Sequence, residues 1–297
     1  MRLDLLLIRR HPGLSRRKAR DVIEKGQVDV DGQTVTAAGQ EVAQSVRVQW
    51  DPDRRARPRV RLSLPLLYAD DALLIVDKPA GLLSVPTVSG ADEDSVAGRI
   101  ADYVRRLRPR RPYVGVVHRL DRDTSGALAL ALDAHTREAL RELFRSHRVE
   151  RRYLALVAGV PRQPDATIDL PIRDAYLAGR RAIARPGEPG KPARTRIRLR
   201  ERFRSASLLE LELFTGRQHQ IRIHLAHVGL PVLGDLIYGG PEATALAVPR
   251  QMLHAEMLGF THPSSGRLVH AVSPMPPDFE AVLQELRREA GRPAPRR

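Results

Sequence analysis

The hydrophobic pattern of the first 25 residues predicts two short helices. A leucine-rich run over Leu3–Leu7 begins the first helix, and the His-Pro-Gly triplet at 11–13 ends it. Ser15 is a typical N-cap for the second helix, because its hydroxyl can accept a hydrogen bond from a backbone N–H of the first turn. The apolar residues that follow have the i, i+3, i+4 spacing of one helix face: Ala19, Val22 and Ile23.

The period then changes from that of a helix to that of a strand. Gly26 is a natural end for the second helix, and Val28 and Val30 alternate with polar residues. Asp31-Gly32 is a strong signal for a two-residue hairpin turn, after which Val35 starts the return strand. Residues 1–50 are therefore predicted to form one small helix-hairpin domain.

A charged, proline-rich segment separates this domain from the rest of the chain. Residues 51–61 read DPDRRARPRVR, and this composition predicts a linker because its one isolated valine cannot form a core. We expect a second domain over 62–284. A basic tail is expected over 285–297, with its proline-rich end at 291–297 frayed.

The segment 62–284 has the pattern of an α+β domain, with a mainly antiparallel mixed sheet flanked by helices. Apolar stretches predict strands at 72–77, 114–117, 127–132 and 153–158. Asp133 is placed to cap a helix whose apolar face is Ala139, Leu140, Leu143 and Phe144. Between 195 and 214 apolar residues recur at every second position, which predicts half-buried antiparallel strands with one polar face.

Composition and charge narrow the classes of function. The 297 residues include 50 Lys and Arg against 35 Asp and Glu, a formal net charge of +15, with arginine clusters at 105–111 and 194–204. GC-rich codon usage can explain the choice of arginine over lysine, but the excess of cations favours a polyanionic partner. The absence of cysteine excludes disulfides, a thiolate metal site and a Cys nucleophile. The pattern contains no export signal or membrane span, so we expect a cytoplasmic protein.

The most unusual segment is the polar turn HRLDRDTSG at 118–126, which lies between two almost wholly apolar stretches. This placement puts its side chains at the end of a buried sheet, where a pocket can form. Asp121 lies between Arg119 and Arg122, and flanking cations favour its ionised form, which suits a nucleophile or a base. The same composition is also typical of a surface turn with Asp–Arg pairs, so this pattern alone leaves both interpretations open.

A second polar cluster, TGRQHQIRIHLAH, occupies 215–227. Its histidines at 219, 224 and 227 are spread around a helix and no carboxylate lies within the segment, so no metal site is expected. Arg222 is flanked by Ile221 and Ile223 and is expected to need a carboxylate partner, for which Asp121 is a candidate.

The run HRLDRDTSG strongly resembles the signature of the RluA family of RNA pseudouridine synthases (RluC/RluD-like). Four further segments agree in order and approximate spacing: KPAGLLSVP at 78–86, RRYLALV at 151–157, TGRQHQIRIHLAHVGLPVLGDLIYG at 215–239 and LHAEMLGFTHP at 253–263. The resemblance covers about residues 66–280 and implies a cofactor-independent isomerase with the pseudouridine synthase fold. The sequence departs from the family pattern at Ser89–Asp94.

The resemblance also implies roles for individual residues. Asp121 matches the catalytic aspartate, Tyr153 the active-site tyrosine that packs against the target base, and Arg222 the basic residue that forms a salt bridge to the aspartate. Arg119 matches the arginine that enters the RNA stack where the uridine leaves. The other RNA contacts expected in this domain are His118 and Arg217.

The N-terminal domain resembles the small RNA-binding domain named after the fourth small-subunit ribosomal protein. The resemblance rests on a leucine-rich helix, Gly-Leu-Ser-Arg-Arg, a helix ending in Glu-Lys-Gly, and Val-Asp-Val-Asp-Gly. It implies that the second helix docks on structured RNA. The residues expected at the phosphates are Ser15, Arg16, Arg17 and Arg20.

Together these resemblances predict a monomeric RNA pseudouridine synthase with no cofactor, no metal and no membrane partner. Large-subunit ribosomal RNA is the expected substrate, and transfer RNA is the alternative. Two other interpretations stay open at this point: a non-catalytic RNA-binding or ribosome-assembly protein, and a histidine-metal hydrolase that acts on nucleic acid.

Overall fold

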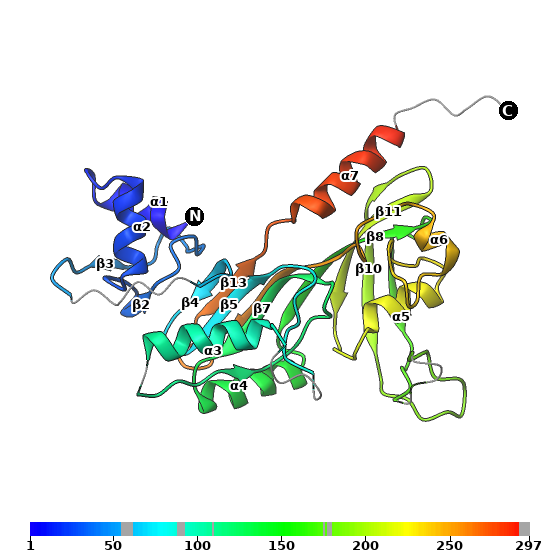
Figure 1. Ribbon diagram of the computed structural model, residues 1–297, viewed down its shortest axis with the longest axis horizontal. Coiled ribbons are helices and arrows are strands. Elements are labelled where there is room, and N and C mark those ends of the chain that lie inside the picture. The colour runs from blue at the N-terminus through cyan, green and yellow to red at the C-terminus, as the bar shows by residue number, and fades with distance from the viewer. Residues whose placement is uncertain (55–61, 88–92, 109, 175, 177–179, 291–297) are drawn as a thin grey trace. The chain divides into compact units, whose positions relative to one another are not determined.

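The computed structural model describes residues 1–54, 62–87, 93–108, 110–174, 176 and 180–290 (Figure 1). The chain divides into two compact units. The first unit comprises Met1–Arg122, Ala127–Val149 and Leu258–Ser273, and the second comprises Asp123–Gly126, Glu150–Met257 and Pro274–Arg297. Most of the predicted linker (55–61), the predicted frayed end (291–297) and most of the segment that departs from the family pattern lie outside the described residues.

The N-terminal part of the first unit is a helix pair packed on a small sheet. α1 (Leu3–Arg10) and α2 (Arg16–Glu24) share a core with β1 (Val28–Val30), β2 (Gln33–Val35) and β3 (Val48–Trp50), which have the order β2-β1-β3. As predicted, Ser15 caps α2 by accepting a hydrogen bond from the Lys18 backbone N–H. Asp31 and Gly32 have φ angles of 49° and 84°, which is the conformation of the expected hairpin turn. The strand β3 was not predicted, because its three residues give no periodic signal.

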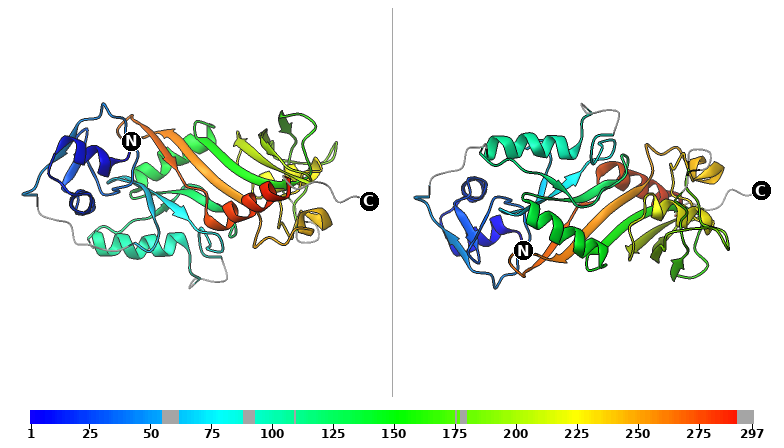
Figure 2. Two further views of the ribbon diagram at one scale, coloured as in Figure 1. Left: turned by 90° about the horizontal axis from the view of Figure 1, so that it is seen from above. Right: turned by 90° about the horizontal axis from the view of Figure 1, so that it is seen from below.

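The other strands and helices of the first unit lie in separate layers. β4 (Leu66–Ala69) is antiparallel to β5 (Leu73–Lys78), and β6 (Gly115–Val116) is antiparallel to β7 (Ser125–Ala131). β13 (Leu268–Val272) pairs with β12 (Leu253–Thr261). The helices α3 (Val96–Leu107) and α4 (Ala134–Arg145) lie on the same side of these strands (Figures 1 and 2). Leu140 of α4 is fully buried in a core with Ile75 and Ala129.

The second unit is built on antiparallel strands in the order β8-β11-β10-β9. These strands are β8 (Glu150–Ala158), β9 (Asp165–Asp169), β10 (Arg194–Arg202) and β11 (Ala206–Leu213), and the helices of the unit are α5 (Gln220–His227), α6 (Gly240–Thr244) and α7 (Pro277–Ala290). Ser125 at the start of β7 pairs in parallel with His254 of β12. The predicted α+β class with a mixed, mostly antiparallel sheet is confirmed.

The strand pair β10–β11 differs from the prediction of a polar, solvent-facing side. β11 is buried on both faces, and Glu210 is only 3% exposed. Arg198 and Arg200 of β10 form ion pairs with the Glu210 carboxylate and cover it. The prediction of one polar face is therefore wrong for β11, because arginine side chains of the neighbouring strand shield its acidic residue from solvent.

The predicted tail also begins inside a helix. α7 continues to residue 290, and its apolar face includes Leu286, which is 2% exposed. Phe279 and Leu283 of the same helix pack against Leu156 and Phe203. Within the described part of the chain, no helix has the length and apolar content needed to cross a membrane.

Candidate active site

The backbone on either side of Asp121 is held by a second loop of the first unit. Ser84 Oγ donates to the Leu120 carbonyl oxygen at 2.7 Å and accepts from the Leu120 N–H at 3.0 Å. Arg122 Nε donates to the Gly81 carbonyl oxygen at 3.1 Å. The half-buried Asp121 thus sits between two anchored neighbours. We call residues 118–124 the catalytic loop, after the role that the family resemblance implies for Asp121.

Lys78 is a third anchor of the catalytic loop. Its side chain is completely buried, and Nζ donates to three carbonyl oxygens: Arg122 at 2.8 Å, Leu82 at 2.7 Å and Pro79 at 2.9 Å. A buried ammonium group is costly unless its donors are satisfied, and three carbonyl acceptors match its three N–H groups. Lys78 therefore ties the end of β5 to the residue that follows Asp121.

The end of the catalytic loop is held by side chains of the second unit. Arg250 Nη1 donates to the Asp123 carbonyl oxygen at 3.1 Å, and Gln251 Nε2 donates to Thr124 Oγ1 at 2.8 Å. Arg250 is itself fixed by a bidentate pair with Asp278, at 2.6 and 3.1 Å. A glycine is required at position 126, two residues after Thr124. A Cβ at Gly126 would lie 2.2 Å from the carbonyl oxygen of Ala255.

Arg119 and His118 precede Asp121 and differ in their surroundings. Arg119 is exposed, and it forms no ion pair with the residues that the structure describes, so its guanidinium is accessible to a ligand. His118 Nε2 accepts a hydrogen bond from the Ala129 N–H at 2.9 Å, and its ring stacks on Phe144 at 4.6 Å. His118 therefore has a local structural role beside β7, and the predicted RNA contact stays a prediction.

Arg222 in α5 is buried and paired with Asp235. Arg222 Nε and Nη2 donate to the two Asp235 carboxylate oxygens at 2.7 and 2.8 Å, and the exposed fractions of the two side chains are 5% and 1%. The guanidinium also lies 5.1 Å from the centre of the Tyr238 ring. Burial alone would raise the pKa of the Asp235 carboxyl, but hydrogen bonds and attraction from Arg222 bring this pKa below its ordinary value.

The carboxylate that the structure shows against Arg222 is therefore Asp235, which the sequence analysis did not single out. The expected ion pair between Arg222 and Asp121 joins residues of the two units and stays a prediction. The Asp235 pair occupies Nε and Nη2, so it sets the direction in which the Nη1 group points.

Tyr153 and Arg217 also lie in the second unit. Tyr153 is 7% exposed in β8, opposite Leu211 of β11. Arg217 precedes α5, and its Nε donates to the Pro192 carbonyl oxygen at 3.0 Å. β8 fixes the position of Tyr153, and Arg217 lies in the turn before α5, where its backbone N–H donates to Gln220 Oε1 at 3.0 Å. Their roles toward RNA stay predictions.

The histidines before and within α5 are held by protein groups. His224 Nδ1 and Nε2 lie 3.0 Å from Thr195 Oγ1 and the Leu170 carbonyl oxygen, and burial lowers the pKa of this imidazole. His219 Nδ1 lies 2.9 Å from the Tyr238 hydroxyl. Among the described residues, no three His, Cys, Asp or Glu side chains are grouped as metal ligands.

In the N-terminal domain, the four predicted phosphate contacts have unequal surroundings. Arg16 and Arg20 approach the fully buried Asp4 carboxylate at 3.5 and 3.7 Å. The Ser15 hydroxyl caps α2. Arg17 is exposed and has no ion-pair partner in the described ranges, so its guanidinium is accessible to a phosphate.

Comparisons with known proteins identify the family. Residues 72–227, more than half of the chain, match the family described as RNA pseudouridylate synthase, and residues 1–48 match the S4 domain. The chain belongs to the RNA pseudouridylate synthase family. A protein of Xanthomonas campestris named ribosomal large subunit pseudouridine synthase D is 37% identical, over 99% of this chain and 91% of that protein. A protein of Nitrosomonas europaea with the same name is 38% identical, over 97% and 85%.

Solved structures of pseudouridylate synthases have the same fold. Human RNA pseudouridylate synthase domain containing 4 aligns with a TM-score of 0.62 and 25% identity, over 75% of this chain and 92% of that one. Human RNA pseudouridylate synthase domain containing 1 aligns with a TM-score of 0.59 and 26% identity, over 80% and 99%. The predicted enzyme class is confirmed. This pseudouridine synthase is an isomerase, and the comparisons support neither the metal hydrolase nor the non-catalytic interpretation.

Three positioning residues of this pseudouridine synthase were not predicted: Lys78, Ser84 and Asp235. Each belongs to a segment that carries the family resemblance. The partners of Lys78 and Ser84 lie far along the chain, and Asp235 pairs with Arg222 at a separation of 13 positions. Lys78 and Arg122 are separated by 44 positions, and Ser84 and Leu120 by 36. Two of these residues had a signal in the sequence that could have singled them out. Lys78 is a charged residue directly after an apolar strand, and Asp235 is a lone carboxylate among apolar and glycine residues.

Proposed function

We propose that this pseudouridine synthase isomerises uridines in large-subunit ribosomal RNA. The observation that carries the proposal is the similarity to two proteins named ribosomal large subunit pseudouridine synthase D, which extends over at least 97% of this chain. Such coverage includes the S4 domain as well as the catalytic domain. We further propose that the enzyme acts as a monomer in the cytoplasm.

The reaction exchanges one bond of the nucleoside for another. The N1–C1′ glycosidic bond of uridine breaks, the free uracil turns, and a C5–C1′ bond forms, while the hydrogen of C5 is removed and N1 gains one. No oxidant, reductant or water is consumed. The base must leave the RNA stack before the bond becomes accessible, at a cost of a few kcal/mol. We propose that Arg119, which is exposed beside Asp121, occupies the space that the base leaves.

Asp121 is the proposed catalytic carboxylate. Cleavage builds positive character on the sugar, which an adjacent carboxylate stabilises. Three roles satisfy this chemistry: nucleophile at C1′, nucleophile at the uracil ring, and base that removes a sugar proton. Anchoring of Leu120 and Arg122 supports any of the three, because each requires a carboxylate held in a fixed position.

Tyr153 and Arg222 complete the proposed catalytic set. Arg222 is proposed to pair with Asp121 and to orient it, and the rigid pair with Asp235 supports this role because it fixes the guanidinium plane. Tyr153 is proposed to pack against uracil and to exclude competing water. His118 and Arg217 are proposed to contact the flanking RNA.

Mapping of pseudouridines in cells with and without the gene tests the substrate. We expect specific sites to disappear from large-subunit ribosomal RNA and to return when the wild-type enzyme is supplied, but not when Asp121→Asn is supplied. Loss of sites only in transfer RNA would replace the proposed substrate. An unchanged map in both RNA classes would contradict the proposed function.

A further inference from the structure

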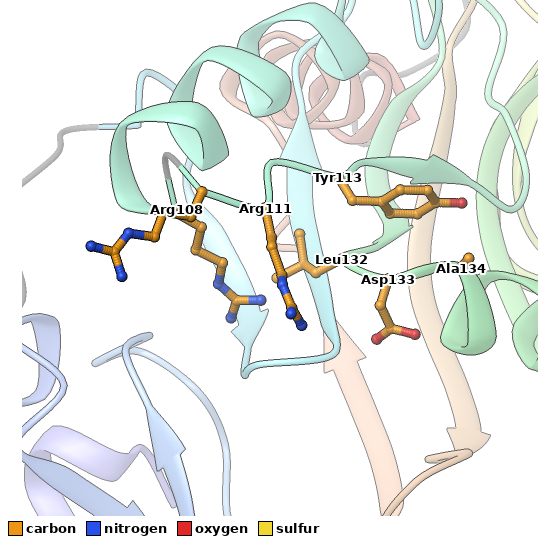
Figure 3. Close-up of a pocket in the computed structure, with 7 residues that line it drawn as sticks. Arg108, Arg111, Tyr113, Leu132, Asp133 and Ala134 are labelled. Carbon is orange, nitrogen blue, oxygen red and sulfur yellow. The ribbon is translucent and has the colours of Figure 1, made fainter.

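A cavity of about 820 Å³ lies in the first unit, beyond the end of β7 that is distant from the catalytic loop (Figure 3). Ligand sites in proteins typically have volumes of about 300–1,000 Å³. The wall comprises side chains that follow α3 and side chains that join β7 to α4: Arg108, Arg110, Arg111, Tyr113, Leu132 and Asp133. None of them belongs to the catalytic machinery described above.

The cavity has an uncompensated positive charge. Arg108 is paired with Asp71, through Nη2 to Oδ1 at 2.7 Å. Arg110 and Arg111 are exposed, and neither forms an ion pair with a residue that the structure describes. Figure 3 shows the Arg111 side chain between Arg108 and Asp133. Two guanidinium groups are therefore available to an anionic ligand.

The one carboxylate in the wall does not offset these two arginines by pairing with them. Asp133 is the N-cap of α4, where Oδ1 accepts from the Thr136 N–H and Oδ2 accepts from Thr136 Oγ1, both at 2.7 Å. The N-terminal end of α4 borders the same space and adds partial positive charge. The wall thus favours an anion over a cation.

The cavity also offers an aromatic ring. Tyr113 is half-buried, and Leu132 beside it is 6% exposed. The Tyr113 hydroxyl is buried beside the Arg137 guanidinium, so the exposed part of this residue does not include the hydroxyl. An aromatic ring beside arginines is the combination that binds a base and its phosphates.

We propose that this cavity binds one nucleotide of the substrate RNA, separate from the uridine that reacts. Arg110 and Arg111 hold phosphodiester groups, and the Tyr113 ring stacks on the base. Tyr113 precedes Asp121 by eight positions (121 − 113), which limits the separation to about 29 Å, so one RNA can occupy both sites. This inference rests on the proposed function only in taking RNA as the ligand.

The salt dependence of RNA binding tests the arginines. The probe is an unmodified transcript of large-subunit ribosomal RNA, bound to the full-length protein at several salt concentrations. We expect the double variant Arg110→Ala/Arg111→Ala to lower the slope of log K against log salt by about 1.4–1.8, because two phosphate contacts are lost. The matched control Arg162→Ala/Arg288→Ala removes the same charge at two exposed arginines outside the cavity. Equal slopes for the two double variants would overturn the proposal.

Substitutions of Tyr113 test the base contact. We expect Tyr113→Ala to weaken binding about tenfold with little change of slope, since stacking is independent of salt. Tyr113→Phe should keep most of this affinity. Wild-type binding by Tyr113→Ala would refute the stacking contact.

The arginine double variant also separates an RNA ligand from a protein partner. If this variant binds naked RNA normally but ribosomal particles weakly, the cavity binds a protein, and the proposal of a nucleotide site is wrong.

The binding assay also separates this proposal from the proposed function. Turnover by the wild-type enzyme is measured on the same transcript. If the wild type has normal turnover and the cavity variants bind the transcript as the wild type does, the cavity proposal is wrong and the proposed function stands. If the wild type shows no turnover but the variants bind the transcript more weakly, the proposed function is wrong and the cavity stands as an RNA site.

Discussion

The Arg222 guanidinium has one orientation because Asp235 binds it through two hydrogen bonds and both side chains are buried. Asp235 Oδ1 also accepts the backbone N–H groups of Ile237 and Tyr238, each at 3.0 Å. A carboxylate with this many donors is itself immobile, and the arginine it holds is suited to orient a second carboxylate. The proposed role of Arg222 toward Asp121 depends on this rigidity.

Substitution of Asp235 tests the positioning of Arg222. We expect Asp235→Asn to lower kcat by about 10²-fold through misplacement of Arg222, and to lower the free energy of unfolding by about 3–5 kcal/mol because one charge of a buried pair is lost. Arg222→Ala should also reduce turnover. Steady-state kinetics and urea unfolding measure the two effects.

The control for this substitution is a pair of the same geometry on the surface. Asp165 accepts two hydrogen bonds from Arg196 at 2.9 and 2.6 Å, but both side chains are substantially exposed. Asp165→Asn should change the free energy of unfolding by no more than about 1 kcal/mol and leave kcat unaltered. Equal kinetics for Asp235→Asn and Asp165→Asn would rule out the positioning role.

The same pair predicts a pH dependence of stability. The pKa of Asp235 in the folded protein lies below the ordinary value of about 3.9. Protonation therefore favours the unfolded chain, so the stabilisation is present above about pH 4 and is lost as the pH falls through the folded pKa. We expect the free energy of unfolding to decline below pH 4, and to decline less in Asp235→Asn. Parallel declines in the two proteins would contradict this assignment.

At the scale of elements, the catalytic loop depends on its neighbours for its conformation. In the first unit, Lys78 and Ser84 hold the residues around Asp121. In the second unit, Arg250 and Gln251 hold Asp123 and Thr124. The loop is therefore polar on its exposed side and anchored by buried hydrogen bonds, which is the arrangement expected where a carboxylate must be held in place for catalysis.

Removal of the Lys78 ammonium group tests this anchoring. Lys78→Met leaves three carbonyl oxygens without their donor, and each buried unsatisfied group costs about 1–3 kcal/mol. We expect a lower Tm and a lower kcat, with little change in RNA affinity. Lys191→Met, at an exposed lysine that pairs with Asp174, should resemble the wild type. A wild-type kcat in a folded Lys78→Met protein would show that the loop does not need this anchor.

Elements with a clear period were predictable from sequence, and contacts between distant segments were not. The cap of α2, the hairpin turn at Asp31-Gly32, and β5, β7 and β8 follow from local patterns. The burial of Glu210 depends on arginines of a neighbouring strand, and the extension of α7 depends on what covers Leu286. In the site, Asp121 was found by resemblance, whereas Asp235 required the fold.

At the scale of the whole molecule, the net charge of +15 is distributed unevenly between paired and unpaired arginines. The cluster at 194–204 is partly neutralised, since four of its six arginines pair with three acidic residues: Arg194, Arg196, Arg198 and Arg200. Arg17, Arg110, Arg111 and Arg119 are exposed and have no such partner among the described residues. Other exposed arginines, such as Arg162 and Arg288, also form no ion pair among the described residues. Because these four lie in the S4 domain, in the cavity and beside Asp121, we expect them to contribute most to RNA binding.

Arg17 in the S4 domain provides a direct test of that distinction. Arg17→Ala should lower the salt slope of RNA binding by about 0.7–0.9 without a change in Tm, because the side chain contacts phosphate and supports no core residue. Arg9→Ala in α1 is the matched control, since Arg9 is exposed and bonds only Gln44 in the described structure. An equal slope for both variants would place the RNA surface of this domain elsewhere.

The most direct test of the central claim is pseudouridine formation on an unmodified transcript of large-subunit ribosomal RNA. The assay compares the wild-type enzyme with Asp121→Asn and with Asp123→Asn, an exposed aspartate of the same loop. We expect the wild type and Asp123→Asn to form pseudouridine, and Asp121→Asn to form none while it binds the RNA with nearly unchanged affinity. Full activity of Asp121→Asn would contradict the assignment of Asp121 as the catalytic carboxylate.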